Sequence, residues 1–179
     1  MRELDEVTRP RAATGVPLRP DQQSAGRHLR AIHDNFRHEL AVVLEAVEAV
    51  RQGEATPGDV RDAVHQLTWR QHREDIGSFC GQLCRFVTMH HTIEDQAMFP
   101  TVAALPGFAP VVERLMDEHH VVHERLVRID EVLVRMQGDE AAFDDLATAV
   151  AALSEVLLSH FLYEEEEMGE AMGLAGLLV

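Results

Sequence analysis

The run RFVTMHHTIEDQAMFP, residues 85–100, decides how the chain folds. On an α-helix, residues four apart lie on the same face, so His90 and Glu94 form a pair. Counting back from His90 at helical spacing gives only apolar residues: Val87, Leu83, Phe79 and Ile76. His90 and Glu94 therefore continue an apolar stripe that faces a core. An imidazole and a carboxylate buried together need strong partners.

Composition favours a helical globular domain with an acidic surface. The chain has 179 residues, of which 46% are hydrophobic, with one Trp and one Tyr. Its 16 basic residues are all Arg, and the formal net charge of −15 argues against a nucleic acid or an anionic membrane as partner. No apolar run approaches the roughly 18 residues that span a bilayer, and no signal-peptide core precedes the domain. We therefore expect a cytoplasmic protein.

Apolar periodicity predicts four helices joined by short turns. Their expected ranges are about residues 21–51, 59–105, 110–136 and 140–168. Short connections give antiparallel neighbours, so we predict an all-α, up-down-up-down four-helix bundle over residues 21–172. Residues 1–20, rich in Pro and without an apolar period, are expected to form a flexible tail, and residues 173–179 a C-terminal tip.

The stripes that face the predicted core contain one polar set. Its members are His33, His90, Glu94, His119, His123, His160 and Glu164. Taken singly, each has an ordinary interpretation: a lone His is usually a hydrogen-bonded core residue, and Glu164 could belong to the solvated acidic run 164–167. Taken together, seven unpartnered polar groups at about 1–3 kcal/mol each would consume most of a domain's stability of about 5–15 kcal/mol. A shared metal centre removes this cost.

The ligand types narrow the choice of metal. Seven ligands are too many for one tetrahedral zinc site, and two carboxylates among five imidazoles suit two ions that the carboxylates bridge. No thiolate lies on the ligand face, which argues against an iron–sulfur cluster. Imidazole and carboxylate ligands with an open position are typical of non-haem iron, with manganese or zinc as alternatives.

Other residues near these faces are weaker candidates. His91 and His120 each lie one residue round the helix from a predicted ligand and could tune the site or simply lie at the surface. Tyr163, Trp69 and His72 could line an entry path. Cys80 and Cys84 lie four apart on one predicted helix, where a disulfide has poor geometry, so we interpret them as buried thiols.

The ordered set of motifs resembles the haemerythrin-like (HHE cation-binding) proteins, and most closely their actinobacterial branch. The matching elements, over about residues 25–170, are His33, His90-x-x-x-Glu94 followed by Met98-Phe99-Pro100, His119-x-x-x-His123 and His160-x-x-x-Glu164. In the oxygen carriers of this family the last carboxylate is an Asp five residues after its His. Here Glu164 stands at four and Glu165 at five, and Glu164 is assigned because it is in phase with the apolar stripe.

The resemblance implies a carboxylate-bridged centre of two iron ions, with an oxo or hydroxo bridge. His119, His123 and His160 would hold one iron, and His33 and His90 the other, which keeps an open position. Glu94 and Glu164 would bridge the two. The function implied is binding of O2, NO or peroxide at the open iron, as sensor, store or scavenger. The alternatives are a di-iron enzyme with peroxidase, catalase-like or oxygenase activity, and iron handling or iron-dependent regulation. No protein partner is indicated.

Overall fold

The computed structural model describes residues 3–12, 15–57, 82–136 and 142–177, and within them it is helical without strands. Four long helical segments make up the fold, which confirms the predicted all-α four-helix bundle. They are α1 (Ser24–Arg51), the continuous run of α3 (Gln82–Ile93), π-helix η1 (Glu94–Met98) and α4 (Phe99–Ala103), α5 (Ala109–Met136) and α6 (Phe143–Leu174). Trp69, His72 and Cys80 lie outside the described residues.

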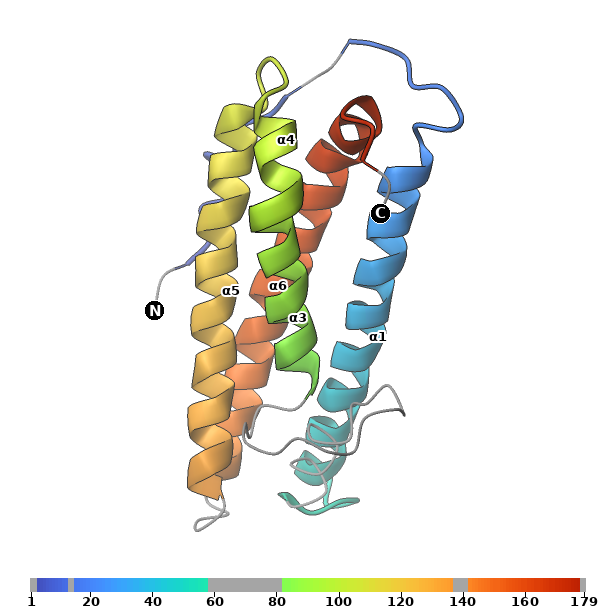
Figure 1. The fold of residues 1–179 in the computed structure, drawn as a ribbon. Coiled ribbons are helices and arrows are strands. Elements are labelled where there is room, and N and C mark those ends of the chain that lie inside the picture. The colour runs from blue at the N-terminus through green and yellow to red at the C-terminus, as the bar shows by residue number, and fades with distance from the viewer. Residues whose placement is uncertain (1–2, 13–14, 58–81, 137–141, 178–179) are drawn as a thin grey trace.

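Figure 1 shows how the four segments are arranged. The chain runs down α1, up through α3 and α4, down α5 and up α6, so successive segments point in opposite directions. Helix α6 packs against both α1 and α5. The buried side chains of all four segments therefore meet along one central axis.

Two apolar cores fill the bundle, one toward each end. One core includes Phe36 and Val87 and the other includes Leu29 and Phe99. On α1, His33 lies between the residues of the two cores, and the other buried His and Glu residues occupy the same position on their own helices. The fold thus places a polar layer between two apolar layers.

The π-helix η1 interrupts the second helical segment at Glu94. The backbone N–H of Phe99 donates to the carbonyl of Glu94, five residues earlier, where an α-helix would use a spacing of four. Pro100 follows in the first turn of α4 and has no N–H to give to the carbonyl of Gln96. The wider π-helical turn occurs where Pro100 cannot donate the usual α-helical hydrogen bond. It begins three residues after His91.

Helix α6 is longer than expected and ends at Leu174 rather than near residue 168. The helix continues through Gly169 and Gly173. These glycines lie where α6 comes close to α1 and its N-terminal flank. A Cβ on Gly26 would lie 2.9 Å from the Cα of Gly169, and a Cβ on Gly173 would lie 2.3 Å from the carbonyl oxygen of Gln22. The two backbones pack in direct contact at this end of the bundle.

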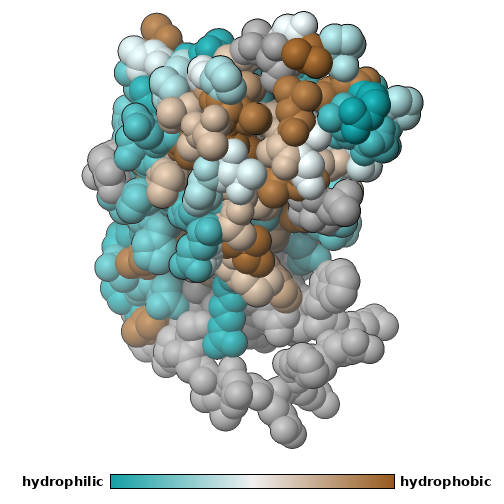
Figure 2. Space-filling model, turned by 45° about the horizontal axis from the view of Figure 1, so that its top comes forward, coloured by the Kyte–Doolittle hydropathy of each residue, from teal (hydrophilic) through white to brown (hydrophobic). Residues whose placement is uncertain are grey.

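By length and composition α6 could also cross a membrane, but more than half of its most apolar window, 56%, is buried in the bundle. It carries His160 and Glu164 on its inner face, as the core helix of a bundle with a polar layer would. The face in Figure 2 mixes hydrophilic residues with scattered apolar ones. The position of α6 in the structure is that of a central core helix.

Two sequence-based expectations differ from the structure. Residues 3–12 were expected within a flexible tail, but they lie against α5 and α6, where Arg9 reaches Glu118 and the Tyr163 hydroxyl donates to the carbonyl of Pro10 (2.8 Å). The carbonyl of Pro10 and the N–H of Ala12 have partners on α6, which periodicity cannot reveal. The second difference is Cys84, which is buried but disulfide-bonded rather than a free thiol.

Candidate metal centre

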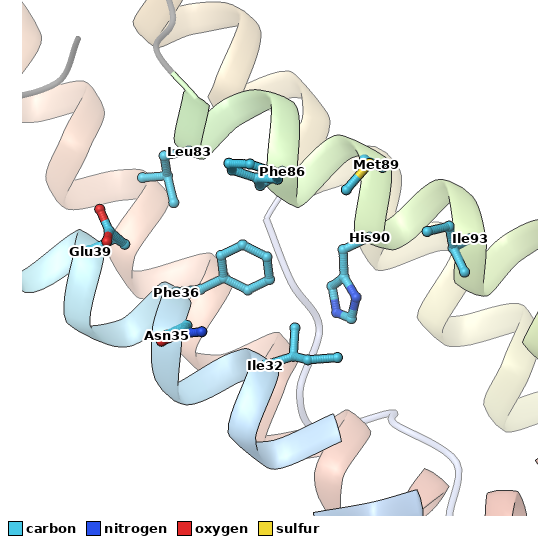
Figure 3. A pocket seen from close by; sticks show the side chains of 9 residues that line it. All are labelled: Ile32, Asn35, Phe36, Glu39, Leu83, Phe86, Met89, His90 and Ile93. Carbon is cyan, nitrogen blue, oxygen red and sulfur yellow. The ribbon is translucent and has the colours of Figure 1, made fainter. Parts of the chain in front are cut away.

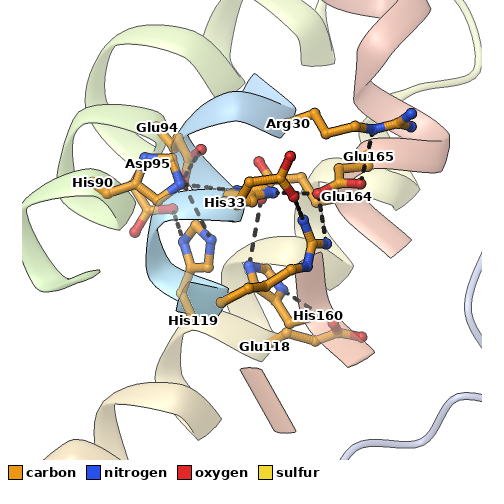
Figure 4. A network of polar contacts seen from close by, with 12 residues as sticks. Arg30, His33, His90, Glu94, Asp95, Glu118, His119, His160, Glu164 and Glu165 are labelled. Atoms are coloured by element: carbon orange, nitrogen blue, oxygen red, sulfur yellow. Dashed lines mark hydrogen bonds and ion pairs between the residues drawn. The ribbon is translucent and has the colours of Figure 1, made fainter. Parts of the chain in front are cut away.

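Two clusters of possible metal ligands lie side by side in the polar layer. The imidazole cluster consists of His91, His119 and His160, and the mixed cluster of His33, His90, Glu94 and Glu164. Within each cluster the ligand atoms lie within 4.8 Å of one another. All of these residues are buried except His90, whose side chain is 10% exposed. Figure 4 shows most of these side chains converging from different helices.

The second helical segment serves both clusters. On α3 the buried residues Cys84 and Val87 define an inner face, and His90 and His91 extend from its two sides. Neighbouring residues on a helix point about 100° apart, so the two imidazoles reach different clusters. Glu94, at the start of η1, comes between them one turn later.

Each of the two buried glutamates lies between the clusters. Glu94 Oε1 is 3.1 Å from His90 Nε2, while its Oε2 is 3.6 Å from His119 Nε2. Glu164 Oε2 is 3.5 Å from His33 Nε2 and 3.6 Å from His160 Nε2. A carboxylate whose oxygens face imidazoles of both clusters has the placement that a bridging ligand requires.

Three of the imidazoles are held from behind by a carboxylate. The Nδ1 atom lies 3.0 Å from Glu165 Oε1 in His33, 2.9 Å from Asp95 Oδ1 in His119 and 3.2 Å from Glu118 Oε2 in His160. An ionised carboxylate only accepts hydrogen bonds, so each Nδ1 carries the proton and each Nε2 carries a lone pair. Metal-ligating histidines characteristically have this outer contact.

Glu165, behind His33, is itself fixed by arginines of α1. Its oxygens accept from Arg37 Nη2 (2.7 Å) and Arg30 Nε (3.2 Å). Burial raises the pKa of Glu165, but the hydrogen bonds from His33 and Arg37 outweigh it and lower the pKa below its ordinary value. The carboxylate therefore stays ionised and orients His33.

Most inner atoms of the site have no hydrogen-bond partner; the exceptions are Nε2 of His33 and Nε2 of His90, which lie 3.1 Å apart. The atoms without a partner are Nε2 of His91, His119 and His160 and both carboxylate oxygens of Glu94 and Glu164. Orphaned buried acceptors of this kind are rare in proteins, and here they all face one another. Metal ions would satisfy these lone pairs together, so the residues present fit the group that the sequence predicted.

Burial sets the protonation of the metal-free site. Desolvation first, and neighbouring imidazoles second, lower the pKa of His90 to about 3 and the pKa values of His91 and His160 well below the ordinary value. Desolvation, followed by the charge of Glu164, raises the pKa of Glu94 well above its ordinary value. Neutral imidazoles are the form that binds a metal, whereas Glu94 must lose a proton to do so.

The structure brings together six of the seven residues predicted as ligands. His33, His90, Glu94, His119, His160 and Glu164 all belong to the two clusters. His123 does not: its side chain is exposed, so the expectation that it faces the core is wrong. The buried face of α5 extends instead toward Glu118, Val121 and Arg125, which leaves His123 at the outer edge.

His91 takes the place that His123 was expected to fill. It stands four residues after Val87, seven after Cys84 and three before Glu94, all of them buried, so helical spacing could have identified it. The set still contains five imidazoles and two carboxylates.

The supporting roles of Asp95, Glu118 and Glu165 were not predicted. Asp95 and Glu165 each follow a ligand directly and fall off the apolar stripe. Glu118 lies three residues after buried Leu115 and four before buried Val122, so helical spacing could have placed it on the buried face.

Two openings lead toward the clusters. A cavity of about 290 Å³ between α1 and α3 is lined mainly by apolar side chains and reaches His90 of the mixed cluster (Figure 3). A smaller polar groove of about 160 Å³ reaches His91 and His119 of the imidazole cluster, and the exposed His120 and His123 line it. The two clusters therefore have surroundings of different polarity.

The comparisons with known proteins agree with this geometry. No curated protein and no solved structure matches the chain. The model of one protein family, the Hemerythrin HHE cation binding domain, matches residues 24–172. This range contains both clusters and all four helical segments except the last two residues of α6. The chain is thus a member of the hemerythrin HHE cation-binding family.

Proposed function

We propose that the chain holds two non-haem iron ions and binds O2, NO or peroxide as a small ligand. The observation that carries the proposal is the set of seven inward ligand groups, most of them orphaned, on five imidazoles and two carboxylates. Neutral imidazole and carboxylate are the ligand types of non-haem iron, with manganese or zinc as alternatives. The ions would supply an electron-rich, redox-active centre for the small ligand.

The placement of the carboxylates supports two ions rather than one. Glu94 and Glu164 each lie within 3.6 Å of an imidazole from either cluster. In this arrangement His91, His119 and His160 hold one ion, His33 and His90 the other, and the glutamates bridge. Glu165 accepts the hydrogen bond from Nδ1 of His33 and lies on the outer side of that ring. This position supports Glu164 rather than Glu165 as the bridging carboxylate.

The mixed cluster is the better position for an incoming ligand. It has two imidazoles where the other cluster has three, and its His90 borders the apolar cavity of about 290 Å³. Diatomic molecules partition readily into apolar space, and the apolar lining keeps bulk water away. We propose a sensor, store or scavenger, and the cytoplasmic location predicted from the sequence stays a prediction.

Metal analysis and an optical titration test this proposal. The purified protein, loaded anaerobically with Fe²⁺, should hold two iron ions per chain and develop a new charge-transfer band on exposure to air or peroxide. The control is His123→Ala, which should behave as the wild type. Fewer than two ions per chain, or no new band, would overturn the proposal.

The size of the cavity also favours a second candidate, an oxidoreductase that uses peroxide or O2 on a small apolar substrate. A volume of about 290 Å³ exceeds what a diatomic ligand needs, and Phe36, Phe86 and Ile32 could contact an organic molecule. Steady-state turnover of peroxide with an organic reductant tests it. Turnover lost in His33→Ala, while the helical fold survives, would favour the enzyme, and no turnover by the wild type would exclude it.

A further inference from the structure

The N-terminal arm, residues 3–12, makes a contact that reaches the imidazole cluster. Arg9 donates to Glu118 through two parallel hydrogen bonds, Nε to Oε1 (2.8 Å) and Nη2 to Oε2 (3.0 Å). The side chains of Arg9 and Glu118 are only 8% and 2% exposed. Glu118 Oε2 in turn accepts from Nδ1 of His160, a member of the imidazole cluster. The arm and the cluster are thus linked by one buried carboxylate. Figure 4 shows Glu118 beside His160.

Several contacts hold the arm in place without touching the cluster. The Tyr163 hydroxyl donates to the carbonyl of Pro10 (2.8 Å), and the backbone N–H of Ala12 donates to Glu167 Oε2 (2.8 Å). The Arg9 guanidinium also lies 4.7 Å from the centre of the Tyr163 ring, at cation–π distance. These contacts fix the position of the arm, and with it the position of Arg9 beside Glu118.

The other two supporting carboxylates do not depend on the arm. Glu165, behind His33, accepts from Arg30 and Arg37 of α1, and Asp95, behind His119, is 29% exposed and reaches solvent. Glu118 is nearly fully buried and accepts from an arginine outside the helices. Without that arginine, no hydrogen-bond donor in the described part of the chain other than His160 would hold the Glu118 carboxylate in its observed position.

We propose that Arg9 is a positioning residue and that the docked arm, through Glu118, holds His160 with its proton on Nδ1 and its Nε2 toward the imidazole cluster. With Arg9 in place, two parallel hydrogen bonds hold Glu118 where it accepts from Nδ1–H of His160, and the Nε2 lone pair faces the cluster. With Arg9 withdrawn, no described donor but His160 itself holds Glu118 in that position, so His160 loses the acceptor that keeps its proton on Nδ1 and its Nε2 lone pair aimed at the cluster. Docking of the arm therefore controls metal binding at the imidazole cluster and not at the mixed cluster. This inference rests on the proposed metal-binding function.

The test compares Arg9→Met and Glu118→Gln with the control Arg11→Met. The control removes another arm arginine, which is itself exposed, pairs with exposed Glu166 and buried Glu167, and is not paired with Glu118. Long-range ¹H–¹⁵N spectra of the metal-free full chain report the tautomer of His160 directly. We expect the proton on Nδ1 in the wild type and in Arg11→Met, and a shift toward Nε2 in Arg9→Met.

Titration with Co²⁺ alone supplies the second readout. The wild type should show two binding events, and Arg9→Met and Glu118→Gln should weaken one of them by about 10–100-fold while the other is unchanged. Arg9→Lys should restore part of the loss, because the charge returns without the two-pronged hydrogen bond. A general loosening of the fold would instead weaken both events, and this outcome would overturn the proposal.

The two readouts separate failure of this inference from failure of the proposed function. If the wild type binds no metal, the metal centre is refuted. If the tautomer of His160 nevertheless differs between the wild type and Arg9→Met, the positioning role is supported. An unchanged tautomer in both Arg9→Met and Glu118→Gln would overturn the positioning role whatever the metal content. If Arg9→Met does not fold, Glu118→Gln, which keeps the shape of the side chain, decides alone.

Discussion

The imidazole cluster and the mixed cluster differ in composition, support and surroundings. The imidazole cluster draws one residue from each of three helices and opens to a polar groove. The mixed cluster has only two imidazoles, shares both glutamates with its neighbour and borders an apolar cavity. The proposed function accordingly places the incoming ligand at the mixed cluster, beside the apolar cavity. The following predictions test this asymmetry, from the largest expected effect to the smallest.

Removing the metal should have the largest effect, because it acts on both clusters. A ligand present at about 1,000 times its Kd stabilises the folded state by about 4 kcal/mol, which for a domain of this size corresponds to roughly 8–16 °C in Tm. Thermal melts with Fe²⁺ and with chelator measure the difference. Identical melting curves would contradict a metal centre on which the fold depends.

Glu94→Ala should weaken both ions, because the oxygens of Glu94 face His90 on one side and His119 on the other. We expect at least about a 100-fold loss of affinity at each position, above the range typical of outer contacts. Metal content after gel filtration is the measurement. Glu113→Ala, at an exposed position of α5, is the matched control and should keep the wild-type content. Loss of only one ion would show that Glu94 does not bridge.

His91→Ala and His123→Ala test whether His91, as in the structure, or His123, as predicted from the sequence, is the third imidazole ligand. His91 is 6% exposed and belongs to the imidazole cluster, so its loss should remove one of two ions. His123 is exposed, so its loss should leave both ions bound. Equilibrium titration of the two variants against the wild type measures this difference. The opposite result would restore the ligand set expected from the family motif.

The metal-free protein should lose stability as the pH falls below about 6.5. The folded-state pKa of His90 is lowered to about 3, and those of His91 and His160 are also lowered, so their stabilising contribution is complete above the unfolded pKa and is lost on acidification. Glu94 acts oppositely, because its pKa is raised and its contribution is lost as the pH rises. Three imidazoles outweigh one carboxyl, so we expect about 2–3 kcal/mol per pH unit between roughly pH 5 and 6.

Urea unfolding of chelator-treated protein at several pH values measures this slope. Exposed His38→Gln is a suitable control, because it removes an imidazole that lies outside both clusters. A free energy of unfolding that rose on acidification would contradict the assigned directions of the pKa shifts.

Filling the apolar cavity should leave the metal untouched and change only access to the mixed cluster. Ile32→Phe enlarges a side chain that lines the cavity, so an organic ligand should bind about tenfold more weakly, whereas NO should bind as before. Leu158→Phe, at an exposed position of α6, is the control. Ligand titration of the iron-loaded variants measures both affinities. Equal organic-ligand binding in Ile32→Phe and wild type would show that the cavity is not the entry.

The sequence was sufficient to predict most of this site because a helix repeats its faces regularly. His33, Glu94, His160 and Glu164 each continue an apolar stripe, and each is buried in a cluster. Periodicity is less decisive at the margin of a stripe. His123 lies at the edge of the buried face of α5, and the rotation of that helix in the bundle leaves it exposed. His91 instead continues a buried spacing on α3 that the stripe drawn through His90 passes over.

What the sequence determined by itself was the all-α bundle and the chemical types of the ligands, since both follow from local periodicity and composition. The tertiary structure decided the rest: which histidine completes the imidazole cluster, which carboxylates stand behind the ligands, and that the arm reaches Glu118 across more than a hundred residues of chain. The physical reason is that these features depend on how helices are rotated and packed against one another. In the stretch that begins at His90, the two adjacent imidazoles look alike in sequence, and only packing sends them to different clusters.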